Sequence, residues 1–395
     1  MLTPSCMLPA LKLGLRIARC FGGVRIEWDK ERKLIAPISS PKRLLFHHTC
    51  CRIQIFLCTL VLIQTYQKRH EDSMTIFMIN AFPVVYMSYC HILTLTYSLK
   101  YRIVIQLLNN MIGFSNKYSE QWKNSSKLDT IEKFAMWTHR FFVYSITPFP
   151  FLYPNSVVRF LPCLAANPGY WILNECSGLE PSSSGIESGK KILVYLANYF
   201  LWAFGLHSAI FVFGTMTAAA TCLRSFLKTY LIEYKNTLHG KKRSNRKFPQ
   251  QMKVAILYRQ IQVMVNMFND IHQKVMMSST VLELILLQIV TFYMVIETEY
   301  SLSNLPYILL FGCIFVNAFI ATLCLFGVMG SVYTDSVRIL KGLKANEKIL
   351  WLKKFHLSCA PVKLQFGQNN FVEKVTALNC EDFFVKQSVN LLLVE

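Results

Sequence analysis

Four polar side chains recur through the last apolar stretch of the chain, residues 371–395. Asp382, Lys386, Gln387 and Asn390 fall on one arc of a helix when each residue turns by about 100°. Asp382 and Lys386 are four positions apart in the acid-first order, so their charges partly neutralise each other. Polar side chains are costly in a bilayer, where they face the protein interior or a water-filled path. This stretch therefore predicts a helix that lines a route for ions or water.

Other kinds of chemistry lack a supporting pattern in the sequence. There is no HExxH, GxSxG or P-loop motif, and the adjacent Cys50 and Cys51 lack the spacing of metal ligands. We therefore predict no enzyme activity, no metal site and no cofactor. The net charge of +20 could indicate nucleic acid, but the basic residues lie between apolar segments and no nucleic-acid-binding motif is present. The sequence thus favours no nucleic-acid partner.

The elements that must position the polar arc are long apolar segments. The chain has 395 residues, of which 53% are hydrophobic and only 16% are charged, against about 25% in soluble domains. Its apolar blocks alternate with charged connectors, as in a protein that crosses the lipid bilayer several times. We therefore predict an all-α membrane protein. The seven expected transmembrane helices are residues 44–66, 74–97, 134–153, 192–222, 276–296, 306–333 and 371–395.

The connectors define an orientation. Four alternate connectors carry nine, six, eleven and seven Lys or Arg residues, whereas the other three carry two, three and none. By the positive-inside rule the N-terminus is cytoplasmic, and seven spans place the C-terminus outside the cell. Charge alone leaves open a chain of six spans with both ends inside. The expected divisions are a cytoplasmic segment 1–43, six spans within 44–333, a cytoplasmic linker 334–370 and a final helix 371–395.

Three connecting segments carry further expectations. Residues 9–21 form either a short amphipathic helix on the cytoplasmic membrane face or part of a flexible basic tail. Residues 252–271 have helical periodicity and are expected to extend the fifth span into the cytoplasm. Residues 154–191 read as an extracellular loop, in which Cys163 and Cys176 either form a disulfide or remain unpaired.

The architecture resembles the arthropod odorant and gustatory chemoreceptor superfamily. The resemblance lies in the chain length, the inverted orientation, the long basic linker between spans four and five, and the C-terminal crossing. The final residues LLVE are similar to the closing segment of the odorant co-receptor, with Glu395 at the position of a Gln. The gustatory TY-x5-QF signature is absent, so the odorant and gustatory subclasses both stay open. A seven-span transporter or another polytopic receptor is the alternative.

The resemblance implies a ligand-gated cation channel in the plasma membrane, built as a homo- or hetero-tetramer with a co-receptor. Each subunit would contribute its last helix to a central pore, with Gln387, Asn390, Leu392 and Glu395 as the pore residues. The match at the chain end makes Leu392 the gate, although the helical wheel places it nearly opposite Gln387. Either the helix rotates or bends near its end, or the match is displaced. Four copies of Glu395 would form a negative ring that attracts cations.

Aromatic residues gather at the predicted outer ends of the spans and suit a small organic tastant or odorant. The resemblance places the ligand pocket in this outer half, among spans two to six. The alternative is that these residues belong to the aromatic belt found at the surface of any bilayer. The candidate ligand contacts are Phe82, Tyr86, Phe142, Tyr144, Tyr195, Tyr199, Trp202 and Tyr307.

Overall fold

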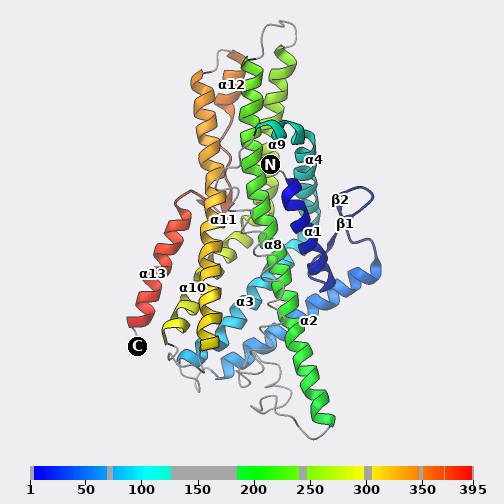
Figure 1. The fold of residues 1–395 in the computed structure, drawn as a ribbon, viewed down its shortest axis with the longest axis vertical. Coiled ribbons are helices and arrows are strands. Elements are labelled where there is room, and N and C mark those ends of the chain that lie inside the picture. The colour runs from blue at the N-terminus through cyan, green and yellow to red at the C-terminus, as the bar shows by residue number, and fades with distance from the viewer. Residues whose placement is uncertain are drawn as a thin grey trace.

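Long helices dominate the computed structural model of the chain (Figure 1). The structure describes residues 4–68, 74–125, 185–239, 247–297, 305–346, 350–368 and 370–393. The predicted third span lies outside these ranges, together with Phe142, Tyr144, Cys163, Cys176 and Glu395. The helices are α1 (Pro4–Cys20), α2 (Pro41–Lys68), α3 (Met74–Leu99), α4 (Tyr101–Ser125), α8 (Gly185–His239), α9 (Lys247–His272), α10 (Met276–Glu297), α11 (Leu305–Asn346), α12 (Leu350–Ser358) and α13 (Thr376–Leu393).

Helices α8 and α11 are the two longest of these helices and run side by side along the bundle (Figure 1). Helix α8 has 55 residues and α11 has 42. At 1.5 Å per residue they are about 80 and about 60 Å long, whereas the hydrocarbon core of a bilayer is about 30 Å thick. Both helices therefore continue well beyond a membrane. The end of α13 lies at the opposite end of the bundle from α12 (Figure 1).

Four helical segments in the described part of the chain are long and apolar enough to cross a bilayer. They are Pro41–Gln67, Ala203–Lys235, Met276–Glu297 and Ile308–Gly342. These segments correspond to predicted spans one, four, five and six. Helices α3 and α13 occupy predicted spans two and seven and are not among the four. The mostly helical fold that the sequence predicts is confirmed.

Several connectors contain more structure than their polarity indicated. The linker expected at 98–133 contains helix α4, and the one at 334–370 contains α12. Helix α9 forms where helical periodicity predicted it, but a turn at residues 273–275 separates it from α10, so it does not simply extend the fifth span. The final helix begins at Thr376, because residues 370–371 pair as β4 (Asn370–Phe371) with β3 (Gln365–Phe366).

The N-terminal segment is folded rather than a flexible tail. Helix α1 packs on α8, and the all-α prediction missed an antiparallel hairpin of β1 (Ile26–Asp29) and β2 (Leu34–Pro37). Asn109 of α4 holds the hairpin, because its amide binds both the N–H and the carbonyl of Ile35 at 2.8 Å. The Asp29 carboxylate accepts hydrogen bonds from two turn amides, which closes the hairpin end.

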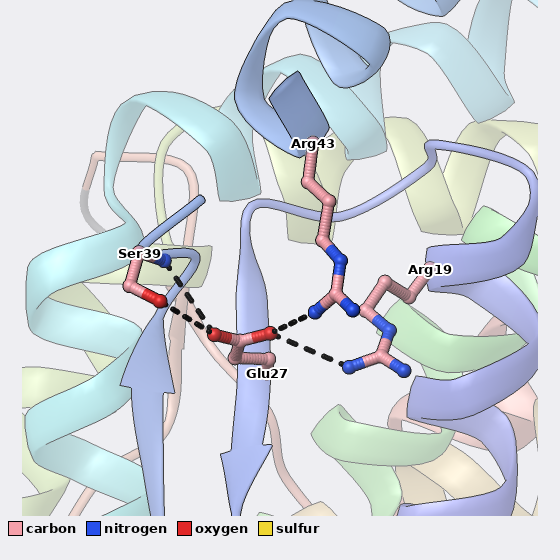
Figure 2. Close-up of polar contacts among 4 residues, drawn as sticks. All are labelled: Arg19, Glu27, Ser39 and Arg43. Carbon is pink, nitrogen blue, oxygen red and sulfur yellow. Dashed lines mark hydrogen bonds and ion pairs between the residues drawn. The ribbon is translucent and has the colours of Figure 1, made fainter. Parts of the chain in front are cut away.

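One carboxylate ties this segment together (Figure 2). Glu27 of β1 pairs with Arg43 of α2 at 3.1 Å and with Arg19 of α1 at 3.4 Å. It also accepts hydrogen bonds from the backbone and the hydroxyl of Ser39, at 3.5 and 3.4 Å. The end of α1, the hairpin and the start of α2 are therefore linked through a single side chain.

Helices α8 and α9 pack together and contain large buried aromatic side chains. Tyr230, Phe226, Tyr258 and Phe268 are all fully buried. Hydrogen bonds attach the α12 region to this core: Tyr230 binds His356 of α12 at 2.7 Å, and the Tyr258 hydroxyl donates to the carbonyl of Ala360 at 2.9 Å. Aromatic burial and these polar contacts fix α12 against α8 and α9.

Candidate functional site

Helix α13 packs on α10 and α11 through a stripe of small and aromatic side chains. Ala377, Cys380, Phe384 and Ser388 are buried along this stripe. The Phe384 ring lies 5.7 Å from that of Phe292 in α10 and 5.6 Å from that of Phe315 in α11. Such aromatic pairs contribute beyond their buried area.

Near the end of α13, Leu391 and Leu392 pack against a small apolar cluster. That cluster contains Tyr293, Met294 and Phe311 from α10 and α11. Leu392 therefore lies on the side of α13 that faces the helix bundle. This agrees with the helical wheel, which places Leu392 away from the polar arc, and its assignment as a gate stays a prediction.

The predicted polar arc lies on the other side of α13. Asp382 and Lys386 form an ion pair at 2.6 Å, with exposed side-chain fractions of 63% and 67%. Asn390 is exposed one turn further on, and Gln387 is half-buried at the edge of the arc. The structure thus brings the four polar residues onto one side of α13, which is covered by neither α10 nor α11.

A buried polar contact joins α13 to the two helices behind it. The side-chain amide of Gln288 in α10 donates to the hydroxyl of Thr322 in α11 at 2.8 Å and to the carboxylate of Glu381 in α13 at 3.3 Å. Gln288 and Thr322 are fully buried. Hydrogen bonds between membrane helices usually contribute about 0.6–2 kcal/mol each. Gln288 therefore fixes the position of α13 relative to α10 and α11.

Replacing Gln288 should loosen this three-helix contact. Gln288→Leu removes the donor to both partners while conserving most of the volume, so we expect the free energy of unfolding to fall by about 1–2 kcal/mol. The measurement is the thermal unfolding of detergent-solubilised protein. Gln260→Leu on α9 is the control, because it makes the same chemical change away from α13. Equal stabilities of the Gln288→Leu variant and the wild type would contradict the assigned role.

The segment before α13 is bound to the bundle rather than free. We call residues 359–375, which connect α12 to α13, the connecting strap. Asn269 of α9 donates to the carbonyl of Lys363 at 2.9 Å and accepts from the backbone N–H of Gln365 at 3.0 Å. Gln273 exchanges hydrogen bonds with Gly367 through both its backbone and its side chain. The strap therefore adds a strand-like layer to the end of α9.

Helix α11 approaches the end of the strap very closely at Gly330. A β-carbon at Gly330 would lie 2.4 Å from the carbonyl carbon of Glu373 and 2.5 Å from the backbone nitrogen of Lys374. These are the residues just before α13 begins. The lack of a side chain at Gly330 thus lets the base of α13 rest directly on α11.

Only some of the predicted ligand-binding residues have side chains that the structure describes. Phe82, Tyr195, Trp202 and Tyr307 lie in α3, α8 and α11, but their side chains are outside the description. Tyr86 is half-buried on α3, and Tyr199 on α8 is half-buried beside Phe21, with ring centres 6.1 Å apart. Tyr86 and Tyr199 therefore come from two helices that pack against each other.

The structure adds polar residues that the sequence analysis did not single out. Glu283 of α10 is 5% exposed and lies close enough to Tyr86 and Tyr89 of α3 to interact electrostatically. The Tyr89 hydroxyl also binds the hydroxyl of Thr280 at 3.1 Å. An acid or amide inside an apolar span is a functional candidate by default, so this signal was present in the sequence for both Glu283 and Gln288.

His272, in the last turn of α9, is buried against a tyrosine of α3. Its Nε2 atom lies 3.2 Å from the hydroxyl of Tyr97 in α3, and its Nδ1 atom lies 2.8 Å from the carbonyl oxygen of Phe268. Tyr97 also binds Thr215 of α8. Burial lowers the pKa of His272 to about 4; the Phe268 carbonyl opposes this shift and the charge of Lys100 adds to it.

This histidine should make the stability of the protein depend on pH. The ordinary pKa is 6.5, so the folded state takes up the proton less readily than the unfolded state. The stabilisation is complete above about pH 6.5 and decreases as the pH falls from 6.5 towards 4. We expect the unfolding temperature to fall between pH 7.5 and pH 5, and to fall less in His272→Gln. An identical fall in both proteins would assign the pH dependence to other groups.

Within the described residues, no cluster of three or more His, Cys, Asp or Glu side chains could hold a metal ion.

Neither a protein-family model nor a curated protein matches the sequence. Solved structures do match. The olfactory receptor OR5 of the insect Machilis hrabei in complex with eugenol aligns with a TM-score of 0.70 and 11% identity, over 98% of this chain and 99% of that one. A second structure of OR5 from the same insect aligns with a TM-score of 0.62 and 11% identity, over 97% of both chains.

The helix arrangement therefore defines a multi-pass helical membrane protein. More specifically, the chain has the fold of the insect olfactory receptors along nearly its whole length. The resemblance predicted from the sequence is confirmed at the level of the fold.

Proposed function

We propose that this chain is a chemosensory receptor of the insect odorant and gustatory superfamily and acts as a subunit of a ligand-gated cation channel. The observation that carries the proposal is the fold shared with an olfactory receptor over 98% of the chain. An incidental likeness between helical bundles would not be expected to extend over 98% of one chain and 99% of the other. Under this proposal the protein has no enzyme activity.

The proposed pore is formed by α13 from four subunits, alone or with a co-receptor. The exposed ion pair Asp382–Lys386 and the exposed Asn390 support this assignment, because polar groups on a membrane helix need water or protein beside them. The opposite face of α13 is already covered by α10 and α11. We place the N-terminus in the cytoplasm, the C-terminus outside, and the protein in the plasma membrane.

The proposed ligand is a small organic tastant or odorant. The support is the group of candidate aromatic residues on α3, α8 and α11, together with the eugenol bound by the structurally similar OR5. Eugenol is aromatic with one hydroxyl group, so it matches a pocket of aromatic rings with few polar groups. Tyr86 and Tyr199 are the described side chains that we assign to this pocket.

Expression followed by electrical recording tests the function. The full chain would be expressed in insect cells, alone and with an odorant co-receptor, and exposed to a panel of phenolic and aliphatic volatiles that includes eugenol. We expect a cation current evoked by at least one member of the panel. Ligand uptake without a channel-like current would support a seven-span transporter and overturn the proposal.

Cysteine substitution tests the pore assignment separately. We expect a charged, membrane-impermeant thiol reagent to block more than half of the ligand-evoked current in Asn390→Cys, because position 390 is exposed on the polar side of α13. Ser388→Cys is the control, since Ser388 is buried on the side of α10 and α11. The unmodified chain measures the response of its native cysteines. Block of Ser388→Cys but not of Asn390→Cys would show that α13 is rotated in the channel.

A further inference from the structure

A basic cavity of about 250 Å³ lies between α1 and the N-terminal hairpin. Four of its lining residues are cationic and one is aromatic. The lining consists of Lys12, Leu15, Arg16, Arg19, Trp28 and Lys30. The hairpin supplies Trp28 and Lys30, so the cavity exists only because the N-terminal segment is folded.

The cations of the cavity are only partly neutralised by the protein. Arg19 pairs with Glu27, whose carboxylate also binds Arg43 (Figure 2). Within the described part of the chain, Lys12, Arg16 and Lys30 form no ion pair. Residues 1–43 contain nine Lys or Arg and three Asp or Glu, so this segment carries an excess of six positive charges. The cavity therefore attracts anions.

Trp28 gives the cavity a rigid wall. The ammonium group of Lys12 lies 4.0 Å from the centre of the Trp28 ring, which is a cation–π contact. This contact holds one cation in place at the cavity before any ligand binds. Trp is also enriched where membrane proteins meet the lipid headgroups.

The surroundings of the cavity indicate a lipid rather than another anion. The chain enters α2 directly after the hairpin, and the first turns of α2 expose Leu45 and Phe46. A β-carbon at Gly22, the second residue after α1, would lie 3.3 Å from the Phe46 ring. The basic segment therefore continues into an apolar, lipid-facing helix. Anionic lipids are concentrated in the cytoplasmic leaflet, on the side where the basic connectors place this segment.

We propose that this cavity binds the phosphate headgroup of an anionic lipid of the cytoplasmic leaflet. Lys12, Arg16 and Lys30 contact the phosphate oxygens, because cationic N–H groups form short, strong hydrogen bonds to phosphate. Arg19 contributes charge while staying on Glu27. The proposal relies on the proposed cytoplasmic orientation of residues 1–43, but it does not rely on channel activity, so it is tested by binding alone.

The test uses the purified full-length protein and vesicles. The probe is a phosphatidylcholine vesicle containing 5% phosphatidylinositol 4,5-bisphosphate, with pure phosphatidylcholine vesicles as the reference, and binding is measured by flotation. Each cation near an anionic surface contributes about fivefold in affinity. The triple variant Lys12→Gln, Arg16→Gln, Lys30→Gln should therefore bind the charged vesicles about 100-fold more weakly, and an unchanged affinity overturns the proposal.

A matched control distinguishes binding at the cavity from attraction by the overall positive charge of the N-terminal segment. Arg32→Gln, Lys33→Gln, Lys42→Gln removes three charges from the same segment outside the cavity. These residues do not line the cavity and Arg32 is already paired with Asp29, so their loss should weaken binding less than tenfold. An equal loss in both triple variants overturns the site. The thermal unfolding of each variant verifies that it is folded. If the triple cavity variant does not fold, the single variant Arg16→Gln replaces it, and we expect its binding to the charged vesicles to be about fivefold weaker. An unchanged affinity of Arg16→Gln would overturn the proposal.

A soluble headgroup distinguishes the source of the phosphate. Inositol 1,4,5-trisphosphate should compete with the vesicles at the cavity but bind more weakly than the lipid, because it lacks the acyl chains that lie against α2. If the soluble compound binds as tightly as the lipid, the cavity binds a free phosphate compound, and the lipid assignment is overturned.

Discussion

Under the proposed function, Gly330→Ala is expected to reduce the ligand-evoked current about tenfold or more at equal amounts of protein on the cell surface. The added β-carbon would lie 2.4 Å from the carbonyl group of Glu373 and 2.5 Å from the nitrogen of Lys374. Both neighbours are backbone, so no side-chain rotation relieves the overlap. Overpacking of this kind costs about 1–3 kcal/mol. The strap must move away from α11, and the base of α13 must move with it.

The control for this substitution lies one turn away on the same helix. A β-carbon at Gly327 would meet nothing within 4 Å. Alanine is about 1 kcal/mol better than glycine inside a helix, so Gly327→Ala should be neutral or stabilising. If Gly330→Ala lowers the stability and Gly327→Ala does not, the contact of Gly330 with the strap is the cause. Wild-type current in Gly330→Ala would mean that the position of the strap does not influence the proposed pore.

Asp335→Ala is expected to destabilise the protein by about 3–5 kcal/mol. The Asp335 carboxylate in α11 pairs with the guanidinium of Arg224 in α8 at 2.9 Å, and the two side chains are only 18% and 6% exposed. Asp335→Ala removes a carboxylate that pairs with a buried guanidinium, and breaking a buried pair from one side costs far more than breaking an exposed pair. The unfolding temperature in detergent and the amount of protein at the cell surface should both fall sharply.

The double variant Arg224→Met, Asp335→Leu tests the reason for that loss. It removes both charges and keeps similar volumes, so it should recover most of the stability lost in Asp335→Ala. Asp382→Asn is the matched control for breaking an ion pair at the surface. Its pair with Lys386 is exposed on both sides and contributes about 0–1 kcal/mol. A double variant as unstable as Asp335→Ala would point to another role for one of these residues.

The main architecture was predictable because apolar length and charge follow directly from the physics of the bilayer. The starts of α3 and α10 were predicted at Met74 and Met276, and the polar arc of α13 was predicted from helical periodicity alone. The ends of α8 and α11 were not predicted correctly. The apolar composition stops at the membrane surface, whereas helical hydrogen bonding continues into the polar region. Helix α4 was missed for the same reason.

The contacts that position α13 could not be predicted from one sequence. Gly330 is one glycine among sixteen, and its role depends on the strap crossing α11 at that point. The pairing of Asn269 with the strap joins residues about 95 positions apart, so no local pattern contains it. The buried Gln288 was visible as a polar residue in an apolar span, but its two partners depend on how three helices pack.

The packing of α13 mainly on α10 and α11 gives a subunit two routes by which a ligand can act on the proposed pore. Helix α3 packs on α10, and α8 packs on α11. A ligand that displaces α3 therefore moves one support of α13, whereas a ligand that displaces α8 moves the other. Compounds that share one pocket but press on different walls would tilt α13 by different amounts. Under the proposed function, partial agonism is then a mechanical property of this fold and needs no second binding site.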